Sequence, residues 1–90
     1  MKLKNKVAIV TGGGKGIGEE ICLGLVKEGA KIVIADLDKE NSSNVIKTII
    51  QNGGEAIYIE TNVSNEQSVK NLISETIKQF NQIDILINNA

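Results

Sequence analysis

Residues 7–18, Val-Ala-Ile-Val-Thr-Gly-Gly-Gly-Lys-Gly-Ile-Gly, join a short apolar run to a cluster of glycines. Residues 19–28 have helical character, so the order is strand, glycine turn and helix. Glycine permits the sharp turn that other residues resist, and it lets the backbone approach a bound pyrophosphate closely. The free N–H groups and the dipole at the start of a helix favour an anion there. The stretch therefore predicts a phosphate-binding turn.

The spacing of these glycines separates the turn from two common phosphate-binding motifs. The pattern G-x-G-x-x-G fits in no register, and a Walker A loop fails because Gly16 follows Lys15 where Ser or Thr is needed. The pattern that fits is T-G-x-x-x-G-x-G, through Thr11, Gly12, Gly16 and Gly18. The alternative is a glycine turn without a ligand, which the strand before it and the helix after it disfavour.

The composition indicates one small α/β domain, and we expect it to span residues 1–90. The chain is 41% hydrophobic but has one Tyr, one Phe and no Trp, so its core must be aliphatic, as is typical of parallel sheets covered by helices. The formal net charge is −1, with no basic stripe for nucleic acid. No stretch resembles a signal peptide or a membrane span. We therefore expect neither nucleic acid nor a membrane as a partner, and a cytoplasmic location.

A single cysteine, Cys22, falls inside the first predicted helix. The sequence has no second cysteine and no histidine, so an internal disulfide and a Cys/His metal site are excluded. We expect Cys22 to be a small buried apolar residue.

Apolar runs alternate with segments of helical periodicity along the chain. Strands are expected at residues 6–11, 31–35, 55–60 and 83–87, and helices at about 19–28, at about 39–52, and after a capping box at Ser64 to Gln67. In the first helix, Ile17, Ile21 and Leu25 are expected on the buried face. The order β-α-β-α-β-α-β predicts a doubly wound parallel sheet with strand order 3-2-1-4.

Polar or glycine-rich residues follow every predicted strand. The glycine turn follows the first strand, Asp36 ends the second, Asn62 follows the third, and Asn88 and Asn89 follow the fourth. All of them should lie at the carboxyl edge of the sheet, where such folds bind ligands at the reversal of strand order. Their convergence predicts a dinucleotide site there.

The whole chain resembles the N-terminal part of a short-chain dehydrogenase/reductase. The motifs that carry the resemblance are residues 11–18, Asp36, Asn62-Val63 and Asn88-Asn89-Ala90, the last being the start of the family's N-N-A-G. The resemblance implies a Rossmann-type dinucleotide-binding domain, truncated after the fourth strand. It also implies an oxidoreductase that transfers a hydride between NAD(P) and an alcohol or ketone carbon of a small molecule, and that is a homo-oligomer when complete.

By the same resemblance, Gly12, Gly16 and Gly18 lie under the pyrophosphate, and Ile17 offers its backbone near the nicotinamide half. Asn62 and Val63 stand where the family has an Asp-Val pair that holds the adenine, whereas Asn88 more simply ties neighbouring strands together. The residues expected to bind the cofactor are Gly12, Gly14, Lys15, Gly16, Ile17, Gly18, Asp36, Leu37, Asn62, Val63 and Asn89.

Asp36 favours NAD as the cofactor over NADP. A carboxylate there accepts a hydrogen bond from the ribose 2′-hydroxyl of NAD and repels a 2′-phosphate. Lys15 points the other way, because in the family a basic residue before the second glycine often accompanies NADP. We give Asp36 more weight, since its repulsion acts at the phosphate itself. Asp38 is expected to cap the second helix instead.

The family's catalytic Ser, its Tyr-x-x-x-Lys pair and a later Asn would all lie beyond residue 90. Tyr58 has no Lys four residues on and is expected to be a half-buried strand residue. We therefore expect no catalytic and no metal-binding residue in this chain, and no activity from it alone. Residues 83–87 would form an uncovered apolar edge strand, so we expect the isolated chain to be poorly soluble or oligomeric.

Two other functions stay open. The first is a non-catalytic dinucleotide-binding or sensing module, which a continuation without Tyr-x-x-x-Lys would favour. The second is a methyltransferase that uses adenosylmethionine, since that class also pairs a glycine turn with an acid after the second strand. The gap between Gly12 and Gly16 and the terminal Asn-Asn-Ala argue against the methyltransferase.

Overall fold

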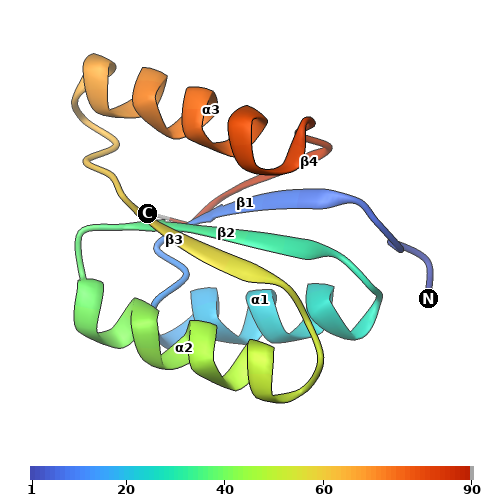
Figure 1. The fold of residues 1–90 in the computed structure, drawn as a ribbon. Coiled ribbons are helices and arrows are strands. Elements are labelled where there is room, and N and C mark those ends of the chain that lie inside the picture. Colours follow the sequence, from blue (N-terminus) through green and yellow to red (C-terminus); the bar gives the residue numbers. More distant parts are fainter. Residues whose placement is uncertain (90) are drawn as a thin grey trace.

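The computed structural model describes residues 1–89 as a parallel sheet with helices on both faces. The elements are β1 (Val7–Thr11), α1 (Gly16–Lys27), β2 (Lys31–Asp36), α2 (Lys39–Gln51), β3 (Ala56–Glu60), α3 (Glu66–Phe80) and β4 (Ile85–Asn88). The strand order is β3-β2-β1-β4. Helices α1 and α2 cover one face and α3 covers the other (Figure 1). The predicted Rossmann-type sheet is confirmed.

Strand β1 is buried on both faces, as its unbroken apolar run predicts. Ala8 and Val10 pack with residues of α1 and α2. Val7 and Ile9 point to the opposite face, where Leu72 of α3 covers them. The two sides of one strand thus belong to two separate cores. β1 lies between β2 and β4, so it fixes where the glycine turn leaves the sheet.

Helix α1 begins earlier than the sequence predicts, and of its predicted apolar face Ile21 and Leu25 pack against the core whereas Ile17 does not. It starts at Gly16, and its buried residues are Gly18 and Cys22. The expectation that Ile17 lies on the buried face is wrong, because Ile17 is 73% exposed. Ile17 is the second residue of the helix and lines an open concavity there. Cys22 is buried as predicted.

Side chains cap the other two helices. Asp38 caps α2 as predicted, with its carboxylate accepting from the Asn41 N–H at 3.0 Å. The hydrogen bonds from Asn41 lower the pKa of Asp38, and the charge of Lys15 adds to this effect.

The capping box predicted at Ser64 is wrong by one residue. Asn65 caps α3, accepting from the Ser68 N–H at 2.9 Å. The Ser64 N–H instead donates to the Asn62 side-chain oxygen at 3.0 Å, which closes a turn before the helix. This turn places residue 65 at the cap position.

Strand β4 forms an edge of the sheet and begins at Ile85, two residues later than predicted. Asp84 precedes it, and its carboxylate accepts from the Val7 N–H at 2.9 Å, which lowers the pKa of Asp84. Leu86 pairs with Ile9 and is 62% exposed. On the same face of the sheet, α3 exposes Ile73 and Ile77 by 40% and 43%. The apolar edge is therefore present, and its effect on solubility stays a prediction.

Within residues 1–89, none of the helices combines the length and the apolar character needed to cross a membrane.

Candidate dinucleotide-binding site

The carboxyl ends of the strands bring the predicted site residues to one edge of the sheet. Thr11, Asp36 and Asn88 are the last residues of β1, β2 and β4. Asn62 lies just beyond β3, which is the strand next to β2. Ala90, the last residue of the Asn-Asn-Ala motif, lies outside the described residues.

The glycine turn after β1 is bonded to both neighbouring strands. Gly12 has a φ of 67° and Gly16 a φ of 58°, a region that favours glycine. The Gly12 N–H donates to the Ala35 carbonyl of β2 at 2.9 Å. The Gly12 carbonyl accepts from the Asn89 side-chain amide, beyond β4, at 3.4 Å. The turn is thus held in a fixed position between β2 and β4.

Gly18 lets the start of α1 pack directly against this turn. A Cβ atom built on Gly18 would overlap the carbonyl oxygen of Gly12 and would lie 2.9 Å from the Asn89 side-chain nitrogen. Any side chain at this position would push helix and turn apart. Close helix–strand packing is the role of the last glycine in dinucleotide-binding turns.

The N-terminus of α1 has no side-chain cap, unlike those of α2 and α3. Its N-cap residue, Lys15, makes no capping hydrogen bond. Gly16 and Ile17 are exposed, and an open concavity of about 540 Å³ lies beside them, lined by Gly16, Ile17, Glu20 and Ile21. The first N–H groups of a helix lack partners within the helix. An anionic group is the natural partner for such an uncapped, accessible N-terminus.

The Asp36 carboxylate is held against the glycine turn by backbone amides. One oxygen accepts from the Gly14 N–H at 3.2 Å, and the other accepts from the Asp38 N–H at 3.0 Å. Tyr58 is half-buried, as predicted, and donates its hydroxyl to the Asp36 backbone carbonyl at 2.9 Å. Burial, followed by the nearby carboxylates, raises the pKa of Tyr58. The carboxylate of Asp36 thus lies directly beside the turn that is expected to bind pyrophosphate.

Thr11 joins the ends of β1 and β4, a role that the sequence did not reveal. Its hydroxyl accepts from the Asn89 N–H at 2.9 Å. The hydrogen of the same hydroxyl has two acceptors within reach, the Asn88 side-chain oxygen at 3.2 Å and the Ile87 carbonyl at 3.3 Å. Asn88 therefore ties neighbouring strands together, as predicted. The only sequence signal for Thr11 was its place at the start of the glycine motif.

The remaining predicted residues rim this edge. The side chains of Leu37 and Val63 are 61% and 45% exposed. Asn62 is exposed, and its backbone N–H donates to the Ser68 hydroxyl at 2.9 Å. This N–H is therefore already occupied within the chain. Contact of these residues with a cofactor stays a prediction.

Cys22 lies directly under the glycine turn. Its thiol is fully buried and donates to the Gly13 carbonyl at a sulfur–oxygen distance of 3.9 Å. Burial, helped by the charge of Glu19, raises the pKa of Cys22 from 9.0 to about 12. The thiol therefore stays neutral and has no nucleophilic character at physiological pH.

The raised pKa of Cys22 predicts a loss of stability at high pH. The unfolded chain ionises its thiol from about pH 9, whereas the folded chain does so only near pH 12. The folded state thus holds its proton more tightly, and the free energy of unfolding should fall by about 1 kcal/mol between pH 9 and pH 10. Urea unfolding of the full-length gene product and of its Cys22→Ala variant measures this. Equal pH dependence of the two proteins would show that Cys22 makes no such contribution.

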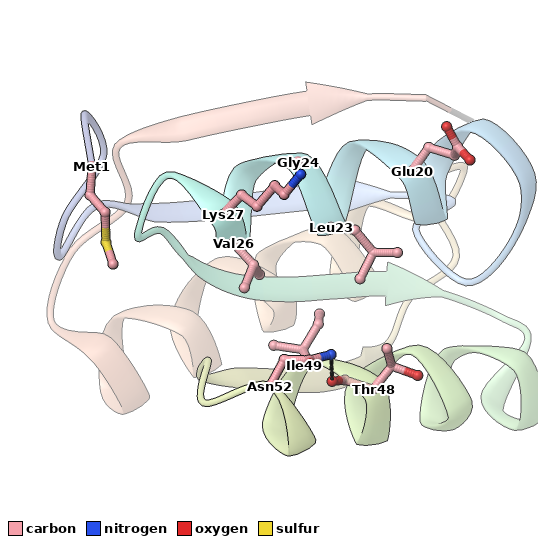
Figure 2. A pocket seen from close by; sticks show the side chains of 9 residues that line it. All are labelled: Met1, Glu20, Leu23, Gly24, Val26, Lys27, Thr48, Ile49 and Asn52. Carbon is pink, nitrogen blue, oxygen red and sulfur yellow. Dashed lines mark hydrogen bonds between the residues drawn. The ribbon is translucent and has the colours of Figure 1, made fainter.

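A separate groove lies between α1 and α2 (Figure 2). It encloses about 700 Å³ and is lined by Met1, Glu20, Leu23, Gly24, Val26, Lys27, Thr48, Ile49 and Asn52. None of the residues expected to bind the cofactor lines it. Within residues 1–89, no three His, Cys, Asp or Glu side chains gather in a way that could hold a metal ion.

An open parallel sheet with a glycine turn, an uncapped helix start and an acid after the second strand defines the class of dinucleotide-binding folds. The sequence model described as short chain dehydrogenase matches residues 6–90. The chain belongs to this family of oxidoreductases.

Relatives and solved structures agree with this assignment. The chain is 36% identical over 90 residues to the 7alpha-hydroxysteroid dehydrogenase of Escherichia coli K12, covering 100% of this chain and 35% of the relative. It is 42% identical over 89 residues to a 3-oxoacyl-[acyl-carrier-protein] reductase of Synechocystis, covering 98% of this chain and 36% of the relative. The chain thus spans about a third of the length of these curated relatives.

Two solved structures share the fold. A crystal structure of hydroxysteroid dehydrogenase from Escherichia coli superposes with a TM-score of 0.95 at 36% identity, covering 99% of this chain and 38% of that chain. A short chain dehydrogenase/reductase from Burkholderia phymatum, solved in complex with NAD, superposes with a TM-score of 0.91 at 30% identity. The match covers 96% of this chain and 31% of that chain.

Proposed function

We propose that this chain supplies the cofactor-binding part of an NAD-dependent oxidoreductase that moves a hydride between nicotinamide and an alcohol or ketone carbon. One observation carries the proposal: the uncapped start of α1 packs, through Gly18, against a glycine turn that also holds the Asp36 carboxylate. Such a site offers backbone donors for a pyrophosphate and an acceptor for a ribose within one turn. The relatives named as dehydrogenases and reductases support the reaction class.

Different residues of the site would bind different parts of the cofactor. The N–H groups at the start of α1 donate to the pyrophosphate, and Asp36 accepts from the ribose 2′-hydroxyl. The exposed side chain of Leu37 follows Asp36 in sequence, and that of Val63 follows β3, the strand next to β2. Both apolar side chains suit the adenine ring, while exposed Ile17 suits the nicotinamide half. When bound, the nicotinamide ring supplies the hydride chemistry.

Asp36 supports NAD rather than NADP as the proposed cofactor. Its carboxylate accepts from two backbone amides beside the glycine turn, so a 2′-phosphate bound there would meet a negative charge. Lys15 is exposed, and its charge acts on Asp38. Part of its attraction for a 2′-phosphate is therefore offset by that carboxylate.

The proton-transfer residues would come from outside residues 1–90. In this chain Tyr58 is tied to the Asp36 carbonyl, and Cys22 is buried and neutral. Neither side chain is available as an acid or a base. The proposal therefore assigns no catalytic residue to this chain, and a homo-oligomer of the complete enzyme stays a prediction.

Calorimetric titration of the full-length gene product with NAD, NADP and adenosylmethionine tests this function. We expect NAD to bind about tenfold or more tightly than NADP, the ratio expected for one hydrogen bond to a charged group. We expect no binding of adenosylmethionine. Binding of adenosylmethionine without NAD would favour a methyltransferase, and absence of dinucleotide binding would overturn the proposal.

A further inference from the structure

Ser42 is a buried hydroxyl with no partner. It lies in the first turn of α2 and has 0% exposure. Its Oγ is the one buried side-chain oxygen or nitrogen in residues 1–89 that makes no hydrogen bond. A buried polar group without a hydrogen bond weakens the folded state, and such groups are rare in proteins. Alanine at this position would avoid that loss of stability. The hydroxyl therefore calls for an explanation.

The hydroxyl lies against the glycine turn, close to the Asp36 carboxylate. A Cβ atom built on Gly14 would lie 2.6 Å from the Ser42 Oγ and 2.9 Å from the Asp36 Oδ2. The missing side chain of Gly14 is thus what lets the hydroxyl and the carboxylate come together. Gly14 itself is buried, so the hydroxyl touches the turn and is shielded from a bound ligand.

The hydrogen bond beside Ser42 is long for a bond to a charged group. The Gly14 N–H donates to the Asp36 carboxylate at 3.2 Å, whereas charge-assisted bonds are usually about 2.7–2.9 Å. The bond to Gly14 is therefore the longer of the two backbone bonds of this carboxylate, since the Asp38 N–H lies at 3.0 Å. A serine hydroxyl can donate one hydrogen bond and accept another at the same time. The Ser42 Oγ lies beside Gly14 and the Asp36 carboxylate but bonds to neither in this structure.

We propose that Ser42 is a positioning residue for Asp36 in the dinucleotide-bound protein. This inference rests on the proposed function. When the ribose 2′-hydroxyl donates to Asp36, the carboxylate turns towards the ribose and releases the Gly14 N–H. The Ser42 hydroxyl then accepts from that N–H and donates to the carboxylate. The partner that Ser42 lacks is thereby supplied on binding, and Asp36 is held in the orientation that recognises the 2′-hydroxyl.

Affinities of the Ser42→Ala variant for NAD and for 2′-deoxy-NAD test this role in the full-length gene product. We expect the variant to bind NAD about 5- to 20-fold more weakly than the wild type. We expect 2′-deoxy-NAD to bind both proteins equally, since it lacks the hydroxyl that moves Asp36. A merely structural role would weaken both ligands alike. The matched control is Ser43→Ala, one residue on and half-buried, which should bind both as the wild type does.

The stability of the variant gives an independent check. Removing an unpartnered hydroxyl should leave the thermal midpoint of Ser42→Ala unchanged or raise it. If wild type and variant bind NAD with the same affinity, the positioning role is wrong while the proposed function stands. If the variant weakens NAD and 2′-deoxy-NAD equally, the role is also wrong. If the wild type binds no dinucleotide, the proposed function fails and this inference fails with it.

Discussion

Replacing Gly18 with alanine should abolish dinucleotide binding and lower the free energy of unfolding by about 3 kcal/mol or more. A Cβ atom at this position would overlap the Gly12 carbonyl oxygen and crowd the Asn89 amide. Both neighbours are fixed, because Gly12 is bonded to β2 and Asn89 to Thr11. Overpacking against such a rigid environment costs about 1–3 kcal/mol, and backbone overlap lies at the upper end. Urea unfolding and calorimetric titration with NAD measure the two effects.

Gly24→Ala is the matched control, since Gly24 lies in the same helix. A Cβ atom at Gly24 would have no neighbour within 4 Å. Alanine is the better helix former by about 1 kcal/mol, so this variant should be at least as stable as the wild type and bind NAD equally. A Gly18→Ala variant that binds NAD normally would show that the close packing of α1 on the turn is not required for the site.

Replacing Asp36 with asparagine should weaken NAD binding by about 10- to 100-fold, the range for a lost hydrogen bond to a charged group. The change keeps the shape of the side chain but removes the charge that accepts from the ribose. NADP should lose less affinity, because the repulsion of the 2′-phosphate disappears as well. The preference for NAD should therefore shrink or reverse. Dissociation constants for both dinucleotides, measured by calorimetry, check this result.

Asp38→Asn is the control for charge alone. It removes a carboxylate two residues away, and asparagine caps a helix as well as aspartate does. The α2 cap to the Asn41 N–H should therefore survive. We expect the NAD preference of this variant to stay close to that of the wild type. If both variants changed the preference equally, general electrostatics rather than Asp36 would select the cofactor.

Most of the fold could be predicted because each strand carries its own signal. Val7 to Thr11 is apolar throughout, and the structure buries it on both faces. The errors arose where a neighbouring element decides the outcome. Ile17 fits a helical apolar face by spacing, yet it is exposed at the start of α1, where it lines an open concavity. Asn65 rather than Ser64 caps α3, because the Ser64 N–H donates to the Asn62 side-chain oxygen and forms a turn before the helix.

The site divides in the same way. Asp36 and Asn89 could be predicted to lie near the glycine turn from their positions after parallel strands, and the structure bonds them to Gly14 and Gly12. Ser42 gave no signal, because serine is common in the first turn of a helix. Ser42 stands out through its burial and its closeness to Gly14 and Asp36, and no pattern along the chain predicts these contacts.

The central claim is that the glycine turn and the start of α1 bind a dinucleotide. Hydrogen–deuterium exchange of the full-length gene product, followed by mass spectrometry with and without NAD, tests it most directly. We predict that NAD slows exchange in peptides that cover residues 11–18 and 36–38, because the ligand occupies or orders those amides. Unchanged exchange in these peptides, with protection confined to the groove between α1 and α2, would contradict the account.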